Sequence, residues 1–267
     1  MKRQNRFRTL FISDVHLGTR GCQAELFLDF IRHHDAETIY LVGDIVDGWR
    51  LRSSWYWPDV HNTIVQKLLR KARKGTRIVF IPGNHDEFAR DYSGLTFGGV
   101  EIQLQAIHET ADGRRFRVMH GDEFDIVVRH ARWLAFLGDW AYVTALFTNT
   151  HFNNIRRRLG LPYWSFSAWA KLKVKNAVNF IGAFEEALAE QAARHGLDGV
   201  ICGHIHHATM RTISGITYVN TGDFVESCTA VVEHFDGRLE IVEWMTFGPS
   251  PELDAMEHTP VPLPEFA

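Results

Sequence analysis

The sequence contains few cysteines, little net charge and no long uninterrupted run of apolar residues. Its three cysteines, Cys22, Cys202 and Cys228, are odd in number and far apart, so we expect neither a disulfide framework nor a paired-cysteine metal site, and a reducing compartment fits best. The longest apolar stretch, residues 133–147, contains Asp139 and falls short of the roughly 20 residues that a membrane span requires. The apolar run near the basic N-terminus is too short for a signal peptide, so export is not expected.

The overall composition is typical of a globular protein. Of the 267 residues, 45% are hydrophobic and 23% are charged, values that exclude a disordered or collagen-like chain. A domain of this length buries roughly three quarters of the surface of its unfolded chain. We expect one main domain over residues 1–247, with a helical, lid-like insertion at about 125–195. Residues 248–267, with five of the eight prolines, form a predicted C-terminal tail.

The net charge of −3 conceals an uneven distribution along the chain. Residues 129–175 contain eight Lys and Arg residues and one acid, a net charge of +7 that leaves −10 for the rest of the chain. The same segment holds four of the eight tryptophans. A basic, aromatic segment within an acidic chain indicates an anionic or membrane-associated partner.

Short apolar runs alternate with amphipathic patterns in the first half of the chain. Strands are predicted at residues 7–13, 38–42 and 77–82, helices at 23–33 and 60–73, and a loop at 49–59. This βαβαβ order implies parallel strands in a sheet covered by helices. Further strands are predicted at 100–108, 115–119, 199–202, 208–213, 216–219, 230–235 and 239–244, and a long helix at 174–195.

Five short motifs lie at or just after the C-terminal ends of predicted strands. They are Asp14-Val-His16, Gly43-Asp44-Ile-Val-Asp47, Gly83-Asn84-His85-Asp86, His120-Gly121-Asp122 and Gly203-His204-Ile-His206. Ligands of α/β sheets bind outside such strand ends, so five separate segments can converge on one site. Any one motif alone is more often a capped turn or a hydrogen-bonded histidine than a metal ligand. The ordered set of five is hard to attribute to core packing.

Together the motifs offer three oxygen donors and four imidazoles, a mixture that suits Mn²⁺, Fe²⁺ or Zn²⁺. These side chains are Asp14, Asp44, Asn84, His16, His120, His204 and His206. In extended backbone, residues two apart point to one face, so Asp14 with His16 and His204 with His206 are each expected to aim at a common point. Glycines at 43, 83, 121 and 203 remove a Cβ beside these side chains. Seven donors suffice for two ions if one carboxylate bridges them.

The ordered set DxH, GDxxD, GNHD, HGD and GHxH resembles the calcineurin-like metallophosphoesterase superfamily over nearly the whole chain except its tail. The resemblance implies a four-layer αββα sandwich, an α/β fold in which two mixed sheets are flanked by helices. It also implies two divalent ions, with Mn²⁺ expected first and Fe²⁺ or Zn²⁺ as alternatives. Asp14, His16 and His206 would hold one ion, Asn84, His120 and His204 would hold the other, and Asp44 would bridge them.

The implied reaction is hydrolysis of a phosphoester or pyrophosphate. Two divalent ions lower the pKa of a bridging water toward neutrality, which generates the attacking hydroxide, and neutralise the phosphoryl oxygens. His85 follows Asn84 and cannot easily face the same ion, so we assign it, with Asp44, to catalysis: His85 would contact the phosphoryl oxygen or the leaving group. A structural hydrogen bond is the alternative for His85. Asp47 or Asp86 would orient a histidine from behind.

Within the superfamily, the layout is similar to the UDP-2,3-diacylglucosamine pyrophosphatases of the lipid A pathway. The shared features are LFISDVHLG at residues 10–18, GDIVDGW at 43–49 and a helical insertion between HGD and GHIH. This likeness implies release of UMP and 2,3-diacylglucosamine 1-phosphate by a cytoplasmic enzyme in peripheral contact with an anionic inner membrane. The aromatic insertion would line an acyl groove, or simply form a core. Expected substrate contacts are Asn84, His85, Asp125, Lys171 and Lys175.

One departure from that group leaves the substrate open. Its best-known members carry Arg where this chain has His85. A phosphoesterase for soluble nucleotides or phosphodiesters is therefore a second hypothesis. A noncatalytic metal-binding scaffold is a third, against which the full set of ligands and His85 argues. Nucleic acid is not an expected partner, because the chain outside the basic segment is acidic, and the sequence indicates no oligomeric state.

Overall fold

The structure, a computed structural model, describes residues 5–124 and 181–244. Its strands are β1 (Asn5–Ile12), β2 (His34–Val42), β3 (Arg77–Ile81), β4 (Thr96–Phe97), β5 (Val100–Ile102), β6 (Ala106–Glu109), β7 (Arg115–Val118), β8 (Gly199–Cys202), β9 (Thr209–Ile213), β10 (Ile216–Asn220), β11 (Thr229–Glu233) and β12 (Leu239–Glu243). Its helices are α1 (Ala24–His33), α2 (Gly48–Ser53), α3 (Asp59–Arg73), the 3₁₀ helices η1 (Glu87–Tyr92) and η2 (Asp122–Phe124), and a helix over residues 181–194.

The strands form two mixed sheets. The seven-stranded sheet has the order β12-β11-β1-β2-β3-β5-β4, and the five-stranded sheet has the order β6-β7-β8-β10-β9. Parallel pairing joins β1, β2, β3 and β5 in the first sheet and β7, β8 and β10 in the second, and antiparallel strands flank each set. The parallel strands therefore end at a common edge of each sheet, where polar loops can gather.

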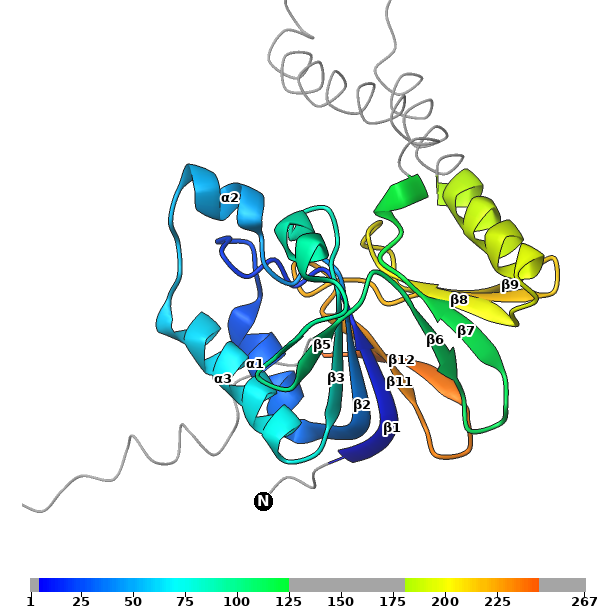
Figure 1. Cartoon of the computed structure of the whole chain (residues 1–267), viewed down its shortest axis with the longest axis horizontal. Helices are drawn as coiled ribbons and strands as arrows, with labels where there is room; N and C mark the ends of the chain where they lie inside the picture. Colours follow the sequence, from blue (N-terminus) through cyan, green and yellow to red (C-terminus); the bar gives the residue numbers. More distant parts are fainter. Residues whose placement is uncertain (1–4, 125–180, 245–267) are drawn as a thin grey trace, which may run out of the picture.

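Alternate residues of each strand enter different parts of the core. In β1, Leu10 packs with α1 and α3 outside the seven-stranded sheet, whereas Phe11 packs between the two sheets. In β8, Ile201 packs between the sheets, and Cys202 packs with the helix over residues 181–194 on the opposite side. Figure 1 shows the resulting order of helices, sheet, sheet and helix. This is the four-layer sandwich that the family resemblance implied.

Two local expectations were wrong. The single strand predicted at 100–108 is two strands, β5 and β6, that belong to different sheets. The chain leaves the first sheet at the exposed residues Leu104 and Gln105, because the alternation of apolar residues specifies a face but not a pairing partner. The predicted loop at 49–59 contains the short helix α2, for which Asp47 accepts a capping hydrogen bond from the N–H of Arg50 (2.8 Å).

None of the helices in the described ranges has the length and apolar character needed to cross a membrane.

Candidate metal centre

The loops that follow β1, β2, β3, β7 and β8 are joined to one another by hydrogen bonds. The N–H of His16 donates to the carbonyl oxygen of Asp44 (2.9 Å), and the N–H of His85 donates to Oδ1 of Asp44 (2.8 Å). The N–H of Gly203 donates to the carbonyl oxygen of His120 (3.2 Å), and the N–H of His204 donates to Oδ2 of Asp14 (3.0 Å). The structure thus brings the five motifs together.

The backbone of these loops is left-handed at most of the candidate ligands. The φ angles are 51° for Asp14, 53° for His16, 54° for Asp44, 73° for His204 and 53° for His206. The expectation of extended backbone for the DxH and HxH pairs was therefore wrong: tight left-handed turns direct these side chains. Such a conformation costs about 1 kcal/mol or more for a residue with a Cβ and is concentrated at functional sites.

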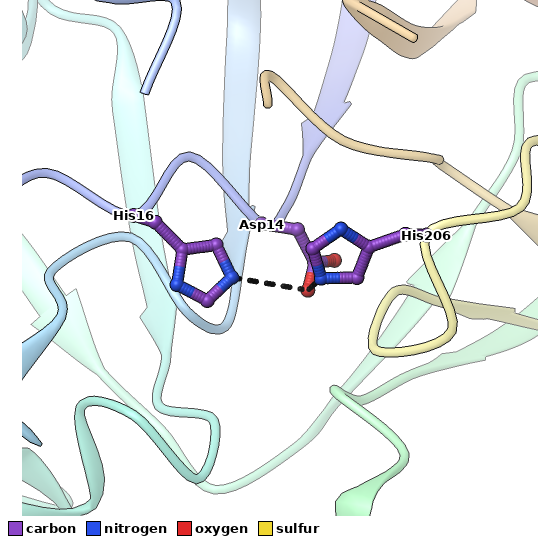
Figure 2. A group of neighbouring side chains, drawn as sticks. All are labelled: Asp14, His16 and His206. Carbon is purple, nitrogen blue, oxygen red and sulfur yellow. Dashed lines mark ion pairs between the residues drawn. The ribbon is translucent and has the colours of Figure 1, made fainter. Parts of the chain in front are cut away.

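A first group of donors consists of Asp14, His16 and His206, whose ligand atoms all lie within 4.8 Å of one another. Oδ1 of Asp14 lies 3.2 Å from Nε2 of His206 and 4.0 Å from Nε2 of His16. Figure 2 shows the two imidazoles turned toward this one carboxylate from opposite sides. The three side chains come from the loops after β1 and β8, so the group exists only in the folded protein.

A second group consists of Asp44, His120 and His204, whose ligand atoms also all lie within 4.8 Å of one another. Oδ2 of Asp44 lies 3.4 Å from Nε2 of His120 and 3.9 Å from Nε2 of His16, a member of the first group. Asp44 therefore lies between the two groups. The Nδ1 of His120 lies 2.9 Å from the carbonyl oxygen of Val42, and since a carbonyl only accepts, Nδ1 carries the proton and Nε2 is left as a donor atom for a metal.

Several buried polar atoms of the candidate ligands have no hydrogen-bond partner among the described residues. They are Oδ1 of Asp14, Nε2 of His16, Nε2 of His120 and both amide atoms of Asn84. Leaving a buried polar atom unpaired costs about 1–3 kcal/mol, so a cluster of such atoms requires an explanation. Divalent cations bind such mixed sets of oxygen and nitrogen atoms, and the residues present therefore fit a metal centre.

In three of the histidines, a carboxylate lies next to Nδ1, the ring nitrogen that faces away from the centre. Oδ2 of Asp47 lies 3.2 Å from Nδ1 of His16 and 3.0 Å from Nδ1 of His85. Oδ2 of Asp223 lies 3.7 Å from Nδ1 of His206. A carboxylate in this position fixes the ring orientation and the tautomer, and leaves Nε2 to face the centre. Sequence reasoning proposed Asp47 for this position and missed Asp223, which lies in no motif and is adjacent to His206 only in space.

Asp86, which was expected as one of two candidates to orient a histidine, instead contacts backbone N–H groups. Its carboxylate accepts backbone hydrogen bonds from Asp44, Ile45, Val46 and Gly83 at 2.6–3.2 Å. Asp86 thereby fastens the loop after β2 to the loop after β3. Burial and the charge of Asp44 raise the pKa of Asp86 to about 6, against the lowering effect of these N–H donors.

Burial and neighbouring charges act in opposite directions on the donors themselves. Burial raises the pKa of Asp14 and Asp44, but His206 beside the first and His120 beside the second hold both pKa values below the ordinary range. Burial lowers the pKa of His120, but the carboxylates of Asp44 and Asp14 raise it to about 10. The carboxylates therefore favour cations at this centre, whether protons or a metal ion that displaces them.

Three glycines lie where a larger residue would collide with the donors. A Cβ at Gly83 would lie 2.3 Å from Oδ1 of Asp44, and a Cβ at Gly43 would lie 2.2 Å from Nδ1 of His120. Gly203 is similarly close to Asp14, at 2.5 Å from Oδ2. At Gly121 the collision is with Phe184, outside the donor groups.

The remaining expected site residues divide into two sets. His85 is partly buried, its Nε2 lies 4.0 Å from Oδ2 of Asp44, and its ring centre lies 4.3 Å from that of Trp49. It therefore borders the donor groups and faces them. Asp125, Lys171 and Lys175, the expected substrate contacts of the insertion, lie outside the described residues.

Comparison with known proteins places the chain in a family. Residues 7–208 match the calcineurin-like phosphoesterase family. A UDP-2,3-diacylglucosamine hydrolase of Xanthomonas campestris is 27% identical over 86% of this chain and 96% of its own length. A second hydrolase of this name, from Porphyromonas gingivalis, is 31% identical over 44% of this chain and 47% of its own length. The chain therefore spans about half of that relative.

Among solved structures, an archaeal phosphodiesterase is similar with a TM-score of 0.43 and 13% identity, covering 88% of this chain and 98% of its own. The family match confirms the expected fold and the expected class of enzyme, a hydrolase. The chain belongs to the calcineurin-like phosphoesterase family.

Proposed function

We propose that this protein hydrolyses the diphosphate of UDP-2,3-diacylglucosamine, or of a similar lipid-linked nucleotide, to UMP and 2,3-diacylglucosamine 1-phosphate. The observation that supports a metal-dependent hydrolase is the convergence of two donor groups on Asp44, with buried ligand atoms that have no hydrogen-bond partner among the described residues. The choice of substrate is supported by the likeness to UDP-2,3-diacylglucosamine hydrolases that align over most of their length.

The proposed assignment of ligands follows the two donor groups. Asp14, His16 and His206 would hold one divalent ion, His120, His204 and Asn84 would hold the second, and Asp44 would contact both. When bound, the ions supply positive charge to the phosphoryl oxygens and increase the acidity of water. The mixed donor set suits Mn²⁺, with Fe²⁺ or Zn²⁺ as alternatives.

His85 is proposed as the catalytic residue that contacts the phosphoryl group. Its Nδ1 lies against Asp47 at 3.0 Å, and its Nε2 is directed toward Asp44 at 4.0 Å, on the side where the phosphoryl oxygen would lie. In this position the ring donates a hydrogen bond to the phosphoryl oxygen or a proton to the leaving group. Asp47 keeps the ring from turning away.

The proposed substrate also suggests where the enzyme acts and which further residues contact the substrate. A diacylated substrate resides in a membrane, so a cytoplasmic enzyme in peripheral contact with an anionic inner membrane is proposed. The predicted substrate contacts of the insertion are Asp125, Lys171 and Lys175. The division of the chain into a main domain, a lid-like insertion and a C-terminal tail also stays a prediction.

The direct test measures UMP release from UDP-2,3-diacylglucosamine by mass spectrometry, with and without added Mn²⁺ and after treatment with a chelator. Release should require the metal, and Asp44→Ala should abolish it by removing the carboxylate between the two groups. Asp236→Ala, which alters an exposed turn between β11 and β12, is the matched control and should retain activity. Hydrolysis by metal-depleted Asp44→Ala protein would rule out the two-metal proposal.

His85 favours a second candidate, a phosphoesterase for soluble nucleotides or phosphodiesters, because the best-known lipid A enzymes carry Arg at this position. Bis(p-nitrophenyl) phosphate and cyclic AMP should be assayed in parallel. Turnover of these diesters without UMP release from the lipid would establish the second function in place of the first.

A further inference from the structure

We propose that a docking face formed by Trp49, Arg50, Arg52, Trp55 and Phe88 binds the surface of an anionic phospholipid bilayer. The face lies on α2, on the loop that follows it, and on η1. It is close to the candidate metal centre, because the N–H of Gly48, the first residue of α2, donates to the carbonyl oxygen of His85 (2.9 Å). Figure 1 shows α2 and the link to α3 at an outer edge of the described molecule.

Trp55 is the most exposed large hydrophobic side chain of the described residues, with 76% of its surface accessible. Its neighbours hold the loop in place. The indole N–H of Trp57 donates to Oδ1 of Asn62 (2.9 Å), and Trp57 packs against the core. The guanidinium of Arg20 lies 4.6 Å from the ring centre of Tyr56. Trp55 is thus held outward from an anchored loop, and an indole in this position suits the headgroup region, where its ring is buried and its N–H stays hydrated.

Two further aromatic side chains extend the face toward the centre. Trp49 is 42% exposed and Phe88 is 44% exposed. Phe88 is adjacent to α2, since a Cβ at Gly48 would lie 3.1 Å from its ring. Single exposed hydrophobic residues are common, but a group of exposed aromatics beside a candidate site indicates an interaction surface.

The charge of the face selects an anionic partner. Residues 48–58 include two arginines and no acidic residue, and η1 adds an exposed acid beside Trp49, Glu87, whose Oε1 accepts the indole N–H of Trp49 (3.3 Å). Arg50 and Arg52 are exposed, and no ion pair to either is found within residues 5–124 and 181–244. A basic residue beside an anionic bilayer contributes about fivefold to the partition coefficient. Arginines next to an outward tryptophan therefore match an anionic lipid surface better than a neutral one.

The inference rests on the proposed function in one respect: a diacylated substrate lies in a membrane, so the enzyme must reach the membrane surface to bind it. Docking would place the candidate metal centre, which α2 contacts through the hydrogen bond from Gly48 to His85, near the level where the glycolipid headgroup lies. Vesicle binding without substrate tests the docking face, and UMP release tests the function, so the two can fail separately.

The experiment measures co-sedimentation of the full-length protein with vesicles of phosphatidylcholine mixed with phosphatidylglycerol, and with vesicles of phosphatidylcholine alone. Binding should be stronger to the mixed vesicles and should weaken with salt. Trp55→Ser should lower the partition coefficient several-fold, and the double variant Arg50→Gln with Arg52→Gln should lower it by about fivefold per arginine. Both variants should still hydrolyse bis(p-nitrophenyl) phosphate normally, which also shows that they fold.

Matched controls come from the opposite end of the sandwich. Phe235→Ser removes another exposed aromatic (52% accessible) from the turn after β11, and Arg70→Gln with Arg73→Gln removes two exposed arginines from the last turns of α3. These should bind vesicles like the original chain. Unchanged binding of the Trp55 and Arg50/Arg52 variants, or equal losses in the controls, would overturn the proposal and leave the face to be covered by another protein or another part of the chain.

Discussion

Oδ2 of Asp47 lies 3.0 Å from Nδ1 of His85, and the same oxygen lies 3.2 Å from Nδ1 of His16. One carboxylate thereby orients a proposed metal ligand and the proposed catalytic histidine together. Hydrogen bonds from both rings lower the pKa of Asp47 although burial raises it. The other oxygen, Oδ1, accepts the N–H of Arg50 and caps α2.

Asp47→Ser should lower turnover by about 10–100-fold with little loss of stability. Serine is a good helix cap, but its side chain is too short to reach the two rings, and carboxylates behind metal-bound histidines have effects of this size. Steady-state kinetics and thermal unfolding measure the two consequences. Asp47→Asn, which retains length and cap, should keep more activity than the serine variant. The opposite order would argue against an orienting role.

His85→Ala should lower turnover by roughly 10²–10⁴-fold, the range for loss of an acid–base group, and should leave metal content nearly normal. The physical reason is that His85 faces the donor groups from their edge, with its Nδ1 3.0 Å from Oδ2 of Asp47. Metal content is measured by mass spectrometry of the purified protein, alongside kcat. A parallel loss of metal and activity would identify His85 as a ligand and contradict the assignment.

Gly83→Ala should abolish metal-dependent hydrolysis. The added methyl would lie 2.3 Å from Oδ1 of Asp44 and 2.6 Å from Nε2 of His120, so both donors must move. Gly182→Ala is the matched control, because a Cβ there meets nothing within 4 Å and alanine favours a helix. Activity and thermal unfolding should be measured for both variants. Normal hydrolysis by Gly83→Ala protein would contradict the proposed position of Asp44 between two ions.

The stability of the fold should fall in acid because of Glu233. Burial raises the pKa of this carboxyl, but hydrogen bonds from His108, Thr9 and the N–H of Ala111 outweigh it and lower the pKa to about 2 from its ordinary 4.5. The unfolded chain therefore takes up a proton first as the pH falls. The stabilisation is present above about pH 5 and is lost progressively toward pH 2, by roughly 3 kcal/mol in total.

Urea unfolding at a series of pH values measures this loss. Glu233→Gln should be less stable at neutral pH, and its free energy of unfolding should change less between pH 5 and pH 2 than that of the original chain. Glu226→Gln, at an exposed site, is the control and should keep the original slope. Parallel pH curves for the chain and for Glu233→Gln would show that another carboxyl dominates acid unfolding.

Local sequence patterns were sufficient for most strands and helices of the main domain. The strand at β3 and the helices α1 and α3 follow from apolar periodicity alone, because each buries one face against a neighbour. The same periodicity does not specify a partner strand. The predicted strand at 100–108 shows this, since Val100 pairs in one sheet and Ala106 in the other.

By itself the sequence determined the candidate donors, since five short motifs at strand ends carry residue types and glycines that packing does not require. Only the tertiary structure decided how they meet: the left-handed turns at Asp14 and His206, the position of Asp44 between two groups, and the carboxylate of Asp223 behind His206. The physical reason is that residue type is a local property, whereas the distance between Asp14 and His206 depends on how β1 and β8 are brought together by two separate sheets.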